Sequence, residues 1–73
     1  MSLSFDFDRV LEFKRVVQAE LGLYLHMHDR CGGQYFEFDD PQPEDVWQQV
    51  EAIFSGFGYT ITINPDNKIF WVE

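Results

Sequence analysis

Apolar residues near the start of the chain recur at the spacing of an amphipathic helix. Between Asp8 and Leu21, the apolar residues Val10, Phe13 and Val17 precede Leu21 at steps of three, four and four. This spacing places them on one helical stripe. Aspartates before the stripe suit the amide-rich start of a helix, and the glycine after it suits a left-handed exit. The pattern predicts a helix here with its opposite face in solvent.

Residues 23–39 alternate instead, and this period of two predicts a β-hairpin around Gly32 and Gly33. A two-residue turn at these glycines would place both histidines opposite carboxylates, whereas a four-residue turn would slide the pairing by two residues and keep the same faces. The pairs of the first register are Met27 with Phe38, His28 with Glu37 and His26 with Asp39. In either register Leu23, Leu25 and Met27 share the apolar face, and Tyr24, His26 and His28 share the other.

A connector that is rich in proline leads to a second apolar helix. Pro41 and Pro43 have no backbone N–H and restrict the residues before them, which disfavours a helix or a central strand over residues 39–43. Pro43 can serve as the first helical residue. A wide apolar face follows, and the glycines at 56 and 58 end the helix. Its members are Val46, Trp47, Val50, Ile53, Phe54 and Phe57.

A second hairpin is predicted around the turn at residues 64–67, between the runs 59–63 and 69–72. We favour the register with Asn64 opposite Lys68, which places Trp71 on the same face as Ile61 and Ile63. A slip of one residue would instead turn Phe70 and Val72 inward and leave Trp71 outside.

The two halves of the chain therefore read alike, as helix, strand and strand. A shift that aligns Val10 with Val46 also aligns Gly22 with Gly58. We predict one α+β domain over residues 1–73, an α-β-β-α-β-β quasi-repeat. Its four-stranded antiparallel sheet would carry both helices on one face.

The charge balance argues against several classes of partner. Thirteen acidic and five basic residues give a net charge of −8, and the basic residues are scattered. Nucleic acids and anionic membranes need clustered cations, so neither is an expected partner. A mimic of DNA is an alternative, but a surplus of carboxylates is commonly a matter of solubility.

The single cysteine excludes an intramolecular disulfide and favours a cytoplasmic location. No stretch approaches the about 20 apolar residues of a membrane span, and no secretion signal is recognisable. We expect a soluble protein that is not exported and has no cofactor.

The motif at residues 28–32, His-Asp-Arg-Cys-Gly, resembles the small bacterial family RDAC, named for Arg-Asp-Ala-Cys ahead of glycine. Gln34 and an aromatic pair follow, and a strand with Phe-Trp lies at residues 69–72. Asp29, Cys31 and Gly32 match the motif, whereas His28 replaces its arginine and Arg30 its alanine. The family has no assigned activity, so the resemblance implies a compact domain of similar length and no mechanism.

The histidine pair suggests a transition-metal or small-ligand site. His26 and His28 would project from one strand face, with carboxylates across the hairpin and Cys31 at its turn. Two histidines beside two carboxylates are also expected to form ordinary cross-strand hydrogen bonds, and we favour this polar face. The candidate ligands are His26, His28, Cys31, Glu37 and Asp39.

Cys31 is also a candidate thiol nucleophile or redox group, because the glycine amides beside it could receive an anion and a histidine could lower its pKa. No orienting third group is visible, so we expect an incidental turn cysteine and no enzyme activity.

The sheet face without helices is the main candidate for function. It would present Tyr24, Tyr35 and one pair from the last strand, either Phe70 with Val72 or Ile69 with Trp71, an apolar patch that invites burial. We therefore predict a small acidic module that binds a protein partner or itself as a homodimer. The candidate residues are Tyr24, His26, His28, Cys31, Tyr35, Glu37, Phe70 and Trp71.

Overall fold

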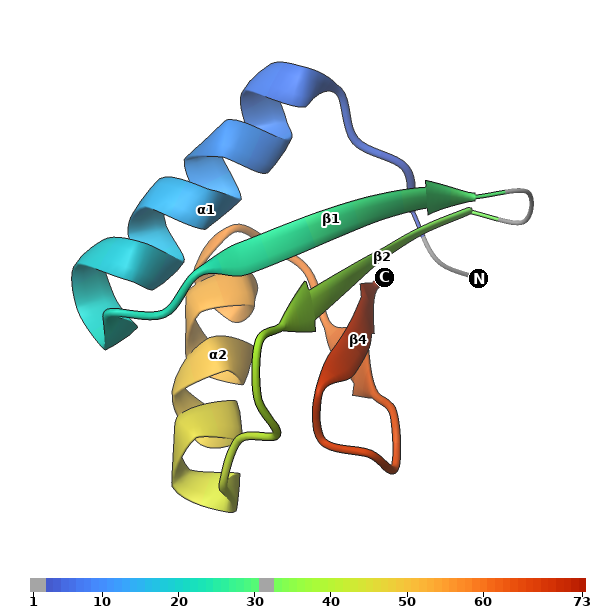
Figure 1. Cartoon of the computed structure of the whole chain (residues 1–73). Helices are drawn as coiled ribbons and strands as arrows, with labels where there is room; N and C mark the ends of the chain where they lie inside the picture. The colour runs from blue at the N-terminus through green and yellow to red at the C-terminus, as the bar shows by residue number, and fades with distance from the viewer. Residues whose placement is uncertain (1–2, 31–32) are drawn as a thin grey trace.

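The structure is a computed structural model that describes residues 3–30 and 33–73. Its element order confirms the predicted α-β-β-α-β-β fold. The elements are α1 (Phe7–Leu21), β1 (Leu25–Arg30), β2 (Gly33–Phe38), α2 (Glu44–Gly56), β3 (Ile61–Ile63) and β4 (Ile69–Val72). The strands form one antiparallel sheet in the order β1-β2-β4-β3. Both helices lie on the same side of this sheet (Figure 1).

Helix α1 has the ends that its sequence predicts. The side chain of Asp6 accepts a hydrogen bond from the backbone N–H of Arg9 at 2.9 Å. Gly22 follows the helix in the left-handed conformation with φ of 67°, which a residue with a Cβ adopts only with strain. The stripe that faces the sheet consists of Val10, Phe13 and Val17.

Helix α2 starts one residue later than predicted. Pro43 is extended, with ψ of 166°, so it caps the helix and Glu44 is the first helical residue. Trp47, Val50 and Phe54 are its buried side chains.

The first hairpin adopts the register that is slid by two residues. Leu25 pairs with Phe38, and the pairing continues to Arg30 and Gly33. Gly33 is therefore a strand residue, and the two-residue turn at Gly32 and Gly33 is wrong. The predicted faces are kept, because a slide of two residues preserves the alternation.

The second hairpin adopts the register that is slipped by one residue from the favoured one. Ile63 pairs with Phe70, not with Ile69, and Thr62 pairs with Trp71. The turn explains the slip, because the Asp66 carboxylate accepts hydrogen bonds from the backbone N–H groups of Lys68 at 2.9 Å and Ile69 at 3.2 Å. These bonds hold Lys68 inside the loop, so it is not opposite Asn64.

Phe70 consequently lies at the centre of an aromatic core. Its ring stacks on Phe36 and Phe38, with centroids 5.4 and 5.7 Å away. Trp47 and Phe54 meet it edge to face at 5.4 and 5.5 Å. Such pairs each stabilise a fold by about 0.5–1.5 kcal/mol beyond the area that they bury.

The segment before α1 completes one end of the sheet. Strands β2 and β4 share the pairs Phe36 with Phe70 and Glu37 with Ile69, and the N–H of Phe38 also donates to the carbonyl of Lys68 at 3.0 Å. At the end beyond these pairs, the backbone N–H of Leu3 donates to the carbonyl of Val72 at 2.8 Å.

The Gln34 side chain on β2 completes the same end of the sheet. Its Nε2 donates to the carbonyl of Phe5 at 2.8 Å, and its Oε1 accepts from the N–H of Phe5 at 2.7 Å. A side-chain amide thus takes the place of backbone pairing between this segment and β2.

Candidate functional site

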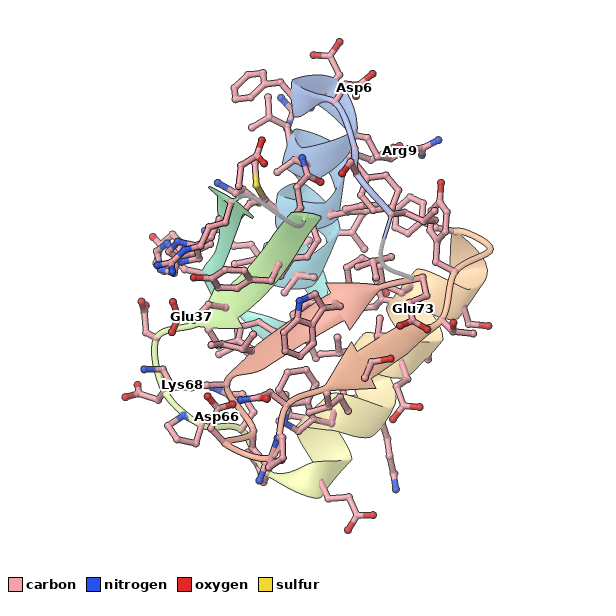
Figure 2. The ribbon with its side chains drawn as sticks, turned by 90° about the vertical axis from the view of Figure 1, so that its right-hand side faces the viewer. Asp6, Arg9, Glu37, Asp66, Lys68 and Glu73 are labelled. Atoms are coloured by element: carbon pink, nitrogen blue, oxygen red, sulfur yellow. The ribbon has the colours of Figure 1, made fainter. Side chains whose placement is uncertain are left out.

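The sheet has one face that no described helix covers, and we refer to it as the open face. Alternation along the strands determines its members, since Leu25, Phe36, Phe38, Phe70 and Val72 point into the core. In Figure 2 the strands lie toward the viewer, in front of the helices, with Glu37, Lys68 and Glu73 on this side. The open face consists of His26, His28, Arg30, Tyr35, Glu37, Thr62, Ile69, Trp71 and Glu73.

Tyr35 is held between two neighbours on the open face. The His28 ring stacks on it with centroids 4.8 Å apart and planes 16° from parallel. The Arg30 guanidinium carbon lies 5.6 Å from the centroid of the same ring, within the range of a cation–π contact. These two contacts restrict the motion of the Tyr35 ring.

Each histidine pairs with a carboxylate, as expected for a polar sheet face. His26 Nε2 lies 2.7 Å from Asp39 Oδ1, and His28 Nε2 lies 3.0 Å from Glu37 Oε1. The partners are diagonal, because the residues directly opposite these histidines are Glu37 and Tyr35. Lys68 Nζ also lies 3.7 Å from Glu37 Oε2.

This geometry adds no support to the metal hypothesis or to the thiol hypothesis. Each imidazole has its own carboxylate, and residues 3–30 and 33–73 contain no group of three or more histidine, cysteine or acidic side chains placed to share a metal ion. Cys31, the candidate ligand and nucleophile, lies outside the described residues. Both hypotheses therefore stay predictions.

The aromatic part of the candidate site needs one correction. Phe70 is fully buried in the core and cannot contact a partner, whereas Trp71 lies half-buried on the open face. The reason is the register of the second hairpin, in which Trp71 is opposite Thr62. Tyr24 precedes β1 and is 64% exposed.

Two charged groups of the open face were missed from the sequence. The sequence indicates Arg30 only as part of the RDAC-like motif, and Glu73 is not among the candidate residues. The Thr62 hydroxyl donates to Glu73 Oε1 at 3.0 Å, which places this carboxylate beside β3. Arg30 is two residues from His28, and Glu73 is two residues from Trp71, so each shares a strand face with that neighbour. This alternation is the sequence signal that indicates both residues.

The open face is close to electrically balanced. Arg30 and the neighbouring Lys68 supply positive charge, and Glu37, Glu73 and the neighbouring Asp39 supply negative charge. The chain as a whole has a net charge of −8. Most of the negative excess therefore lies away from this face, on the helices and loops.

Comparison with known protein families, curated proteins and solved structures found no match for this chain. The resemblance to the RDAC family accordingly stays a prediction. Within the described residues, no helix is both long enough and apolar enough to span a bilayer.

Proposed function

We propose that this chain is a non-catalytic binding module that pairs with a second copy of itself through the open face. The observation that carries the proposal is the position of Trp71, a large apolar side chain on a strand inside the sheet, on the side that no described helix covers. Trp and Tyr are enriched at the centres of protein interfaces. Tyr35 lies on the neighbouring strand β2 and Ile69 on β4, so the apolar area is continuous with Trp71.

The charge balance of the open face favours a second copy. Two molecules of charge −8 repel each other, and this repulsion is smallest where their nearly balanced faces meet. Burial of Trp71 and Tyr35 from both copies then offsets the remaining repulsion.

The register also suggests how the two copies are oriented. Arg30 pairs with Gly33 at one end of the sheet, and Glu73 pairs with Thr60 through backbone hydrogen bonds of 2.8 and 3.0 Å at the same end. These residues lie toward opposite edges. A two-fold axis parallel to the strands would therefore place Arg30 of each copy over Glu73 of the other.

We also propose that this module belongs to the cytoplasm and to an RDAC-like family. The single cysteine supports the location, and the motif at residues 28–32 supports the family.

The two tryptophans provide the test. Trp47 is buried in the core and Trp71 lies on the open face, so a ¹H–¹⁵N spectrum should show two indole signals that Trp71→Phe assigns. Between about 10 µM and about 1 mM, we expect the Trp71 signal to shift with concentration and the Trp47 signal to stay. Light scattering should report a rising mass over the same range. A chain that stays monomeric at about 1 mM in moderate salt contradicts the proposal.

Two sets of variants test the face and the orientation. Trp71→Glu should give a monomer, while Ala19→Glu, which adds the same charge on the exposed side of α1, should not. Arg30→Glu and Glu73→Arg should each weaken the dimer, and the double variant should restore it. If the double variant is no tighter than the single ones, the proposed two-fold axis is wrong.

A further inference from the structure

A groove of about 620 Å³ runs between α1 and α2, in the helical layer. Its walls are apolar side chains that are only partly buried against the core. They are Val16 and Leu21 from α1, and Ile53 and Phe57 from α2 and its end. Ala52 and Gly56, one turn apart on α2, leave room between these walls.

The electrostatics of the groove are negative. Glu20 is the charged residue among the side chains that line it. Helix α2 has no lysine or arginine, and its Glu44 and Glu51 line a separate hollow beside the turn at residues 64–67. The last turns of both helices line the groove, and neither contains a basic residue. The Arg9 guanidinium carbon lies 5.9 Å from the centroid of the Phe57 ring at the end of α2, so the partial negative charge without a cation nearby is that of the α1 C-terminus.

We propose that this groove binds an amphipathic helix of another protein with lysine or arginine beside its apolar stripe. Apolar anchors at positions i, i+3 or i+4, and i+7 would enter between Val16 and Ile53, as in other helix-in-groove complexes. Flanking cations would lie against Glu20 and the C-terminus of α1.

The same charges disfavour the other occupants of this groove. A second copy of the chain would bring its own −8 and no cluster of cations. Nucleic acid would bring phosphates against Glu20, on a chain of net charge −8. A cationic helix is the occupant for which both the apolar walls and the charge are complementary.

Two synthetic helical peptides serve as probes. They share leucines at the anchor positions and differ only in their polar face, which is lysine in one and glutamate in the other. We titrate each into ¹⁵N-labelled Trp71→Glu protein, so that the proposed dimer does not interfere. We expect the lysine peptide to shift the amides of Val16, Ala52 and Gly56 and to bind at least about tenfold more tightly than the glutamate peptide.

A matched pair of variants separates docking in the groove from general attraction to an acidic protein. Ala52→Arg and Ala19→Arg make the same substitution at exposed helical positions, but only Ala52 lines the groove. Arginine has nearly the helix propensity of alanine, so both variants should fold. We expect Ala52→Arg to weaken lysine-peptide binding by about tenfold or more, and Ala19→Arg by less than about twofold.

Several results overturn the proposal. No shift in the groove residues at about 1 mM lysine peptide would do so. Equal losses in the two arginine variants would show only charge attraction. Groove signals that move with protein concentration alone would assign the groove to a second copy. Circular dichroism of each variant verifies that the fold is intact, and the monomeric background keeps this result independent of the dimer.

Discussion

Gln34 is the residue that holds the segment before α1 in place. It is 5% exposed and makes two hydrogen bonds, to the N–H and to the carbonyl of Phe5. Gln34→Ala removes both bonds and leaves these backbone groups without a partner. We expect the free energy of unfolding to fall by about 2–3 kcal/mol, because each unsatisfied buried group costs about 1–3 kcal/mol.

Urea denaturation measures this loss. Gln48→Ala is the matched control, since Gln48 is exposed on α2 and should change the stability by no more than about 0.5 kcal/mol. Equal stability of the two variants would show that the Phe5 segment contributes little to the fold.

Asp66 makes the second turn sensitive to acid. The hydrogen bond from the Lys68 N–H, aided by the Asn64 side chain, the Ile69 N–H and the Lys68 charge, lowers the pKa of Asp66 below its ordinary value of 3.8. The folded state then binds its proton less readily than the unfolded state. The stabilisation is complete above about pH 4, and is lost as the pH falls through the folded-state pKa.

Asp66→Asn should therefore unfold at a lower temperature than the parent at neutral pH, and the difference should shrink below pH 3.8. Thermal unfolding followed by circular dichroism at several pH values measures the difference. Asp40→Asn, an exposed loop variant with the same change of charge, controls for net charge. A difference that is constant with pH would contradict the role of the carboxylate in the turn.

Parity along β1 predicted which residues share the open face, but not which residues they touch. His26 and His28 were expected beside carboxylates, and they are. The stacking of His28 on Tyr35 depends on the register slide, which no residue in the strands specifies. A slide of two residues keeps every side chain on its face and changes all its neighbours.

At the scale of elements, β4 is the strand whose orientation the sequence could not determine. It is apolar on both faces, so either Phe70 or Trp71 could point inward. The deciding contacts are the two hydrogen bonds to Asp66 in the turn. The order of the strands was equally unreadable, because no local pattern places β4 between β2 and β3.

This orientation predicts opposite outcomes for adjacent substitutions. Phe70→Ala should destabilise the protein by about 3–5 kcal/mol, because it removes a fully buried ring and leaves a cavity. A small domain has only about 5–15 kcal/mol of stability in total. Trp71→Ala should cost much less and should mainly weaken self-association. Chemical denaturation of the two variants compares them, and a larger loss for Trp71 would show that the observed register is wrong.

At the scale of the whole molecule, the charge of −8 should make self-association depend on salt. Added salt screens the repulsion between two acidic copies over about 8–10 Å near physiological ionic strength. We expect the dimer to become tighter from about 20 mM to about 300 mM sodium chloride, as measured by sedimentation equilibrium. Weakening over this range would indicate that ion pairs such as Arg30 with Glu73 dominate the interface.

The position of β4 between β2 and β3 has a consequence for synthesis on the ribosome. The chain emerges from its N-terminus, so the β1–β2 hairpin and α2 are made before the strand that joins them to β3. Until Phe70 has been synthesised, four aromatic rings lack the side chain that contacts all of them in the folded protein. These rings are Phe36, Phe38, Trp47 and Phe54. We expect cooperative folding that begins only after β4 has been made, with the inner edge of β2 open to chaperones until then. A chain cut after Asn64 should then show little secondary structure by circular dichroism.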